Sequence, residues 1–177
     1  MTMMSDGARC IALSLALLVA ATAGATHGCG SCERPDVLAP RGVTPGLRLP
    51  WEEVSTPVTD WSFAAGENEI ALETRAPWGR HSVTVWCVVV DRDLYIATDK
   101  SGVSKRWVRH LDRDSHARVG INKRVYPVRA RRVLNRERWD AVLVAYREKY
   151  GAQFYNYDFP KPGEMSRGRI YRLESRR

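Results

Sequence analysis

The sequence predicts a mainly β domain: a small barrel with a few helices packed outside it. Three observations favour this class. Six segments between residues 68 and 175 have the alternating or doubly apolar patterns of β-strands. Only a few helical segments interrupt them, as expected for a barrel with peripheral helices. The hydrophobic fraction of 44% is ordinary for a folded protein, which excludes wholesale disorder.

The first 28 residues are typical of a secretory signal peptide. Residues 1–9 end in a cation, and the continuous apolar run that follows is shorter than the about 20 residues of a membrane span. Cleavage after Ala25 would release a free periplasmic protein. A lipobox-like Thr-His-Gly-Cys would instead make Cys29 a lipidated N-terminus anchored in the membrane. An uncleaved anchor is a third alternative, so export to the cell envelope is expected by any of these routes.

Residues 29–59 are expected to be a Pro-rich linker. Five prolines between residues 33 and 60, with no steady apolar period, predict a tether or an extended wrap. Cys29 and Cys32 form a CxxC pair, which an oxidising compartment could close as a small disulfide unless Cys29 is acylated.

The folded domain is expected to span residues 60–177, and its first half predicts three strands. A short helical turn over 59–67 precedes a strand over 68–76. Residues 81–91 carry the strongest strand signal of the chain, apolar on both faces, and so predict a strand buried on both sides. A turn then leads into residues 94–98, which makes a β-hairpin.

The second half of the domain predicts two helices and three strands. Ser104 is expected to cap a short helix, and Asn135 a longer one that ends at Gly151. Residues 152–168 are expected to form an aromatic-rich loop. The apolar stripe of the longer helix consists of Trp139, Val142, Leu143, Tyr146 and Tyr150, and the strands cover residues 117–122, 124–133 and 169–175.

The charge of the chain favours an anionic partner. Twenty-eight Lys and Arg against twenty Asp and Glu leave a formal net charge of +8. Export makes nucleic acid an unexpected partner. Membrane contact is expected through the N-terminal lipid anchor, with docking of surface arginines on acidic lipid headgroups as an alternative. No complete zinc-ligand spacing and no nucleophile elbow is present, so no metal and no catalytic residue is predicted.

Residues 79–133 resemble a known family. They contain the hairpin VTVWCVVV–DRD–LYIAT, then KRWVRHL, SHARV and finally RARRV. This succession resembles the flavin-binding split barrel of the pyridoxamine 5′-phosphate oxidase-like superfamily over residues 70–150. The resemblance implies a six-stranded split β-barrel, a homodimer, and FMN or a related flavin or deazaflavin. It also implies an FMN-dependent oxidoreductase that passes electrons to a small-molecule acceptor. A non-catalytic ligand-binding or interaction module of the same fold is the alternative.

The resemblance and the chemistry of phosphate indicate the same segment as the cofactor site. Lys and Arg side chains, hydroxyl groups and the N–H groups of a helix start all bind phosphate well. His110 stands where the family has Asn and is expected to donate similarly, and the flavin ring is expected along the hairpin strand. The expected phosphate ligands are Thr98, Lys100, Ser101, Ser104, Lys105 and Arg106, and the expected ring contacts are Val85, Trp86 and Cys87. Alternatively, the cations form only a solvated helix face.

Overall fold

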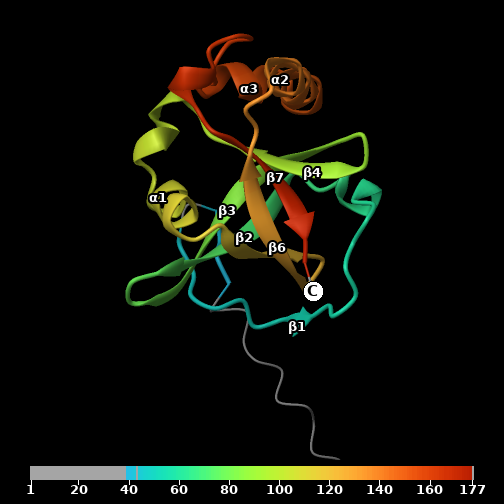
Figure 1. Ribbon diagram of the computed structural model, residues 1–177, viewed down its shortest axis with the longest axis vertical. Helices are drawn as coiled ribbons and strands as arrows, with labels where there is room; N and C mark the ends of the chain where they lie inside the picture. Colours follow the sequence, from blue (N-terminus) through green and yellow to red (C-terminus); the bar gives the residue numbers. More distant parts are fainter. Residues whose placement is uncertain (1–38, 43, 177) are drawn as a thin grey trace, which may run out of the picture. The chain divides into compact units, whose positions relative to one another are not determined.

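Six antiparallel strands close into a barrel in the computed structural model, which describes residues 39–42 and 44–176 (Figure 1). The strands follow the order β2-β3-β4-β7-β6-β5, and β5 pairs back with β2. Their bounds are β2 Glu69–Ala76, β3 Gly79–Val90, β4 Asp93–Ala97, β5 His116–Ile121, β6 Arg124–Arg132 and β7 Ile170–Ser175. The predicted fold class is confirmed. The predicted signal peptide, Cys29 and Cys32 lie outside the described residues.

Two of the hairpins have two-residue loops in which both residues have positive φ. Val90 pairs with Asp93, and Asp91 and Arg92 between them have φ values of 50° and 68°. The β5–β6 hairpin repeats this conformation with positive φ at Asn122 and Lys123. Positive φ at both central residues matches the twist of the flanking strands, so these loops set the register of the barrel.

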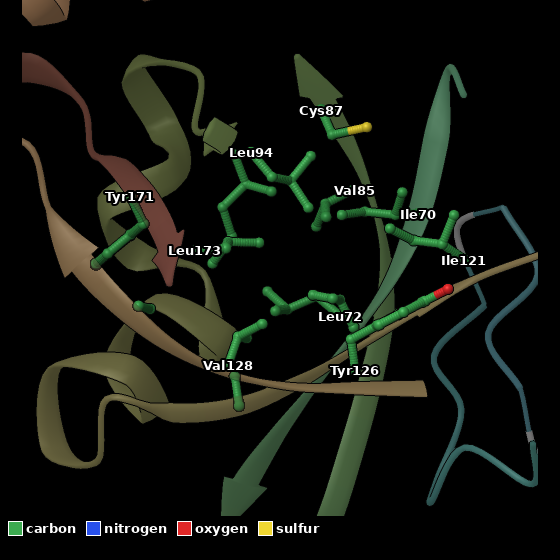
Figure 2. Packing of buried hydrophobic residues seen from close by; sticks show 14 of the residues in the cluster. Ile70, Leu72, Val85, Cys87, Leu94, Ile121, Tyr126, Val128, Tyr171 and Leu173 are labelled. Carbon is green, nitrogen blue, oxygen red and sulfur yellow. The ribbon is translucent and has the colours of Figure 1, made fainter. Parts of the chain in front are cut away.

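The barrel interior is filled by alternate residues of the strands (Figure 2). Along β3, Val85 and Cys87 lie in this interior cluster, whereas Trp86 and Val88 lie in a second cluster outside the barrel wall. Because successive side chains of a strand point to opposite faces, β3 is buried on both sides, as predicted.

Helix α2 (Arg136–Tyr150) supplies the second cluster. The Asn135 side chain caps it, accepting a hydrogen bond from the Arg138 N–H at 2.8 Å, and Gly151 ends it with φ of 50°. All five residues of the predicted stripe are buried against the outer faces of β3, β4 and β7. In Figure 1, α2 lies above β4 and β7, beside the short helix α3 (Ala152–Asn156).

Two sequence predictions about the connections were wrong. Residues 152–168 contain α3 and a 3-10 helix (Met165–Arg167) instead of an uninterrupted loop, because helices this short have no readable period. Helix α1 (Arg106–Arg113) has Lys105, not Ser104, at its N-cap. Ser104 belongs to a preceding 3-10 helix (Lys100–Ser104), in which its hydroxyl donates to the Ser101 carbonyl at 2.9 Å.

The segment before the barrel lies against the outer faces of β2, β5 and β6. Its strand β1 (Glu52–Glu53) pairs in parallel with β6, and Leu49 packs in a small cluster with Ala71 and Val125. Trp51 comes so close to Gly120 that an added Cβ would lie 2.3 Å from the indole ring. Glycine at position 120 therefore makes room for this wrap. In the described part of the chain, no helix has the length and apolarity needed to cross a bilayer.

Tyr150 joins α2 to the backbone of β3. Its hydroxyl accepts from the Cys87 N–H at 3.0 Å and lies 2.8 Å from the Cys87 carbonyl and 2.6 Å from the Asn68 carbonyl. The pairing of β2 with β3 begins at Glu69 and Trp86. Asn68 and Cys87 lie just beyond it, and the Tyr150 hydroxyl hydrogen-bonds to their backbone groups in place of a strand partner. Burial raises the pKa of Tyr150 above its usual value, which keeps the phenol protonated.

Replacing Tyr150 by phenylalanine is expected to lower the free energy of unfolding by about 1–3 kcal/mol, because it removes the acceptor of the buried Cys87 N–H, whereas the Cys87 carbonyl keeps Lys149 as a donor. Urea denaturation followed by circular dichroism measures the change. Tyr155→Phe is the control, because the Tyr155 side chain is 70% exposed. Equal stability of the Tyr150 and Tyr155 variants would contradict the role of this hydroxyl.

Candidate ligand-binding site

A pocket of about 390 Å³ opens beside β3, between this strand, the start of α1 and two flanking loops. We call it the strand-β3 pocket. Its aromatic and aliphatic lining is Val83, Val85, Trp86, Ala97, Trp107, Tyr157, Phe159 and Pro45, and its polar lining is Thr44, Glu69, Thr84, Asp99 and Lys105, with Gly42 at the edge. The mixture of an apolar wall with a few polar groups is typical of small-molecule sites.

The aromatic wall is organised around Trp86. Its ring stacks on Tyr150 with centroids 4.2 Å apart and planes inclined by 5°. Tyr157 meets it edge-on at 4.8 Å, and Phe159 lies nearly parallel to it at 6.0 Å. Strand alternation turns Trp86 out of the barrel, where Tyr150 covers its ring and the loop after α3 packs against it, so a cluster of aromatic rings borders the pocket.

The polar end of the pocket pairs a cation with a carboxylate. Lys105 Nζ lies 3.0 Å from Asp99 Oδ2, and the Ser101 hydroxyl donates to Asp99 Oδ1 at 2.8 Å. Asp99 follows β4 directly, and Lys105 stands at the start of α1, so the intervening 3-10 helix brings them together. Lys105 therefore offers an anion a positive charge that Asp99 partly neutralises.

Three further predicted phosphate ligands have other partners in the structure. Lys100 Nζ pairs with Asp158 at 2.8 Å and with Glu164 at 3.7 Å. The Thr98 hydroxyl is buried and accepts from the Arg169 N–H at 2.9 Å. The Ser104 hydroxyl donates within its own 3-10 helix, as described above. Of the predicted cations, Lys105 alone lines the pocket, while Arg106 beside it is exposed.

Cys87 and His110 do not line the strand-β3 pocket. The Cys87 side chain is fully buried, and burial raises the pKa of its thiol to about 11, so it is an inert part of the core. His110 is buried on the other face of α1, where its Nδ1 lies 2.9 Å from the Thr74 hydroxyl and its ring meets that of His81. Burial lowers the pKa of both histidines, which favours their neutral forms.

Comparison with known protein families identifies the chain. The family described as "Uncharacterized protein conserved in bacteria (DUF2255)" matches residues 63–161, more than half of the sequence. The chain belongs to the DUF2255 family. No curated protein matched it.

Several solved structures are similar to this chain in fold. The conserved hypothetical protein Rv2991 from Mycobacterium tuberculosis is 18% identical, with a TM-score of 0.50 over 71% of this chain and 86% of that one. HutZ, the heme storage protein from Vibrio cholerae, is 14% identical, with a TM-score of 0.49 over 65% and 86% of the two chains. The six-stranded barrel fold predicted from the sequence resemblance is confirmed by the closed barrel of this chain, which shares its fold with Rv2991.

The strand-β3 pocket has an apolar lining and one cation, which suit a flavin-type group. Its volume lies within the roughly 300–1,000 Å³ range of small-molecule sites. The wall around Trp86 suits a flat ring, and Lys105 suits a phosphate or another anion at the far end. Asp99 makes this end of the pocket less suited to a phosphate, because its carboxylate already accepts hydrogen bonds from Lys105 and Ser101. The lining therefore offers apolar contacts to a ring and one cation, Lys105, to a phosphate.

The sequence did not predict several residues that line the strand-β3 pocket. Asp99 lies between Thr98 and Lys100, which are both expected phosphate ligands. An acidic side chain is not expected to bind phosphate, so Asp99 was not predicted to lie at this site. Tyr157 and Phe159 lie about sixty positions after Lys100, in a segment expected only to be a loop. The aromatic content of that segment was its one visible signal. Nothing in the local pattern of Gly42–Pro45 indicates that it borders a pocket.

Proposed function

We propose that the protein binds a flavin-type cofactor, FMN or a deazaflavin, in the strand-β3 pocket and works as a flavin-dependent oxidoreductase. One observation carries the proposal: a single pocket is lined by Val85 and by the aromatic ring of Trp86 on β3, together with the cation Lys105 at the start of α1. These are the two kinds of contact that a ring with an anionic tail needs. The resemblance of residues 79–133 to flavin-binding split barrels supports the same choice.

In this proposal the chain supplies position and polarity. Trp86 and Ala97, from the outer face of the barrel wall, and Val85 of β3 border the space for the ring. Phe159 and Tyr157 exclude water from it. Lys105 holds the anionic tail. A bound flavin supplies the transfer of electrons or hydride itself, so the site needs no dedicated acid or base.

The affinity for FMN relative to riboflavin tests the proposal, because the two share the ring and differ by the phosphate. We expect FMN to quench the tryptophan fluorescence of the purified protein on binding. We expect Lys105→Gln to weaken FMN binding about tenfold or more, since a charge-assisted contact to phosphate is worth roughly 1.5–3 kcal/mol. Riboflavin binding should stay unchanged in this variant.

Arg113→Gln is the matched control, because Arg113 is an exposed cation on the far end of the same helix. It removes one charge of the same sign without touching the pocket. If neither FMN nor deazaflavin binds, or if Lys105→Gln and Arg113→Gln weaken FMN equally, the proposed cofactor site is wrong.

A second function is favoured by the Lys105–Asp99 pair. Because Asp99 already neutralises Lys105, the pocket also suits a flat uncharged ligand in a non-catalytic binding module. Tight binding of riboflavin with no preference for FMN would support this alternative.

We also propose that the protein acts in the cell envelope as a homodimer. The signal-like residues 1–28 support export, and the family resemblance supports the dimer. The mass of the mature N-terminus distinguishes cleavage after Ala25 from lipidation at Cys29, and light scattering measures the dimer.

A further inference from the structure

A second groove lies between α2, α3 and the segment after α3. It has a volume of about 280 Å³, and we call it the α2–α3 groove. Its apolar lining is Leu143, Val144, Phe154, Tyr155, Tyr157, Phe159, Pro160 and Pro162, and its charged lining is Lys100, Arg147, Lys161 and Asp158. Helix α2 presents Leu143, Val144 and Arg147 from adjacent turns, opposite the aromatic residues of α3 and the following loop.

Exposed apolar side chains gather in this groove. Among the described residues seven large hydrophobic side chains are exposed, and three of them, Val144, Tyr155 and Tyr157, line the groove. Tyr155 is 70% exposed and Tyr157 52%. Apolar surface that is gathered around a hollow favours a ligand more than the same side chains scattered over the surface would.

The charges in the groove are unbalanced. Three cations face one carboxylate, and that carboxylate, Asp158, pairs with Lys100. Within the part of the chain that the structure describes, the side chains of Arg147 and Lys161 make no ion pair and no hydrogen bond. The rim of an aromatic groove therefore carries two cations whose side chains form no ion pair, although the Glu164 carboxylate, which accepts from the Lys161 N–H at 2.9 Å, is a counter-charge near Lys161.

We propose that the α2–α3 groove binds a flat apolar compound that carries one anionic group, such as an aromatic carboxylate. The apolar part of the compound lies against Phe154, Tyr155 and Leu143. Its carboxylate is attracted by Arg147 and Lys161. Charge complementarity distinguishes this occupant from a neutral aromatic compound or from a second copy of this basic chain.

The groove adjoins the strand-β3 pocket. Tyr157 and Phe159 line both hollows, so these two rings form the partition between them. A compound in the groove would lie on the other side of this partition from the cofactor of the proposed function. The site in the groove does not depend on that cofactor, because none of its charged residues lines the strand-β3 pocket.

Binding of 2-naphthoate and 2-naphthamide tests the proposal, because the two probes share size and ring and differ in charge. We expect calorimetry to show that the full-length protein binds the carboxylate about tenfold more tightly than the amide, as two exposed ion pairs allow. In the double variant Arg147→Gln/Lys161→Gln this preference should disappear, while amide binding is retained. Phe154→Ala should weaken both probes alike.

Arg136→Gln is the matched control, because Arg136 is an exposed cation at the other end of α2. It should leave the preference for the carboxylate unchanged. Lys105→Gln should also leave naphthoate binding unchanged, so failure of the flavin proposal and failure of this one give different results.

Equal affinity for the two probes, or binding of neither, overturns the proposal. Naphthoate binding that survives in the Arg147→Gln/Lys161→Gln variant overturns it as well. A groove occupied by a second copy would appear as a wild-type dimer that Tyr155→Ser converts to a monomer in light scattering. That result, together with the absence of naphthoate binding, would assign the surface to self-association.

Discussion

Replacing Glu73 by glutamine is expected to lower the free energy of unfolding by about 3 kcal/mol, because it removes the buried partner of Arg118 and leaves only the half-exposed Glu53 as a counter-charge. The Glu73 side chain is fully buried although it faces outward from β2. Both of its oxygens lie 2.9 Å from Arg118 Nη1, and Oε2 also accepts from the Leu49 N–H at 2.7 Å. Arg118 in turn reaches Glu53 at 3.0 Å.

This cluster attaches the segment before the barrel to β2 and β5. Glutamine retains one oxygen that can accept from the Leu49 N–H, but it removes the buried counter-charge of Arg118 and leaves only the half-exposed Glu53 beside this guanidinium. The midpoint of thermal unfolding should fall on the order of 10 °C. Circular dichroism during heating and in urea measures both quantities.

Glu174→Gln is the matched control for Glu73→Gln. Glu174 also contacts two arginines, Arg131 and Arg172, but its side chain is 33% exposed. A partly exposed ion-pair network contributes about 0–1 kcal/mol, so this variant should remain close to wild type. Similar destabilisation by the two variants would contradict the role assigned to the buried pair.

Replacing Asp99 by asparagine is expected to strengthen FMN binding about tenfold, since removing one nearby like charge is worth roughly 1–2 kcal/mol at the protein surface. The Asp99 carboxylate contacts Lys105 and Ser101, the groups that a phosphate would use. Asparagine keeps the shape of the side chain and removes its charge. The affinity should therefore change in the direction opposite to that of Lys105→Gln.

Two controls separate this effect from a general change in charge. Riboflavin has no phosphate, so its affinity should not change in Asp99→Asn. Asp158→Asn removes an exposed carboxylate that pairs with Lys100 outside the strand-β3 pocket, and it should leave FMN binding as in wild type. If Asp99→Asn weakens FMN, or strengthens riboflavin equally, the phosphate does not lie beside Lys105.

Local sequence signals predicted most of the fold. The doubly apolar pattern of residues 81–91 predicted a strand buried on both faces, and Asn135 and Gly151 marked the ends of α2. These signals work because strand alternation, helix caps and two-residue turns are set by residues close together in the chain. The cap of α1 was misplaced by one residue because the preceding 3-10 helix has no comparable signature.

The structure brings together only some of the residues expected at the cofactor site. Val85, Trp86 and Lys105 line the strand-β3 pocket. His110, expected at the same site, lies against Thr74 and His81. Helical position explains the difference, because α1 turns His110 and Lys105 toward different neighbours. The sequence of a basic segment does not show which of its side chains will face a pocket once the helix has packed against the barrel.

The sequence by itself determined the strands, the two main helices, the buried character of β3 and a surplus of cations after the hairpin. Only the tertiary structure decided which cations remain available. Lys100 and Lys105 are five positions apart, yet one turns to Asp158 in the loop after α3 and the other to Asp99. Apolar patterning is a local property of the chain, whereas the partner of a charge depends on which distant segments fold beside it.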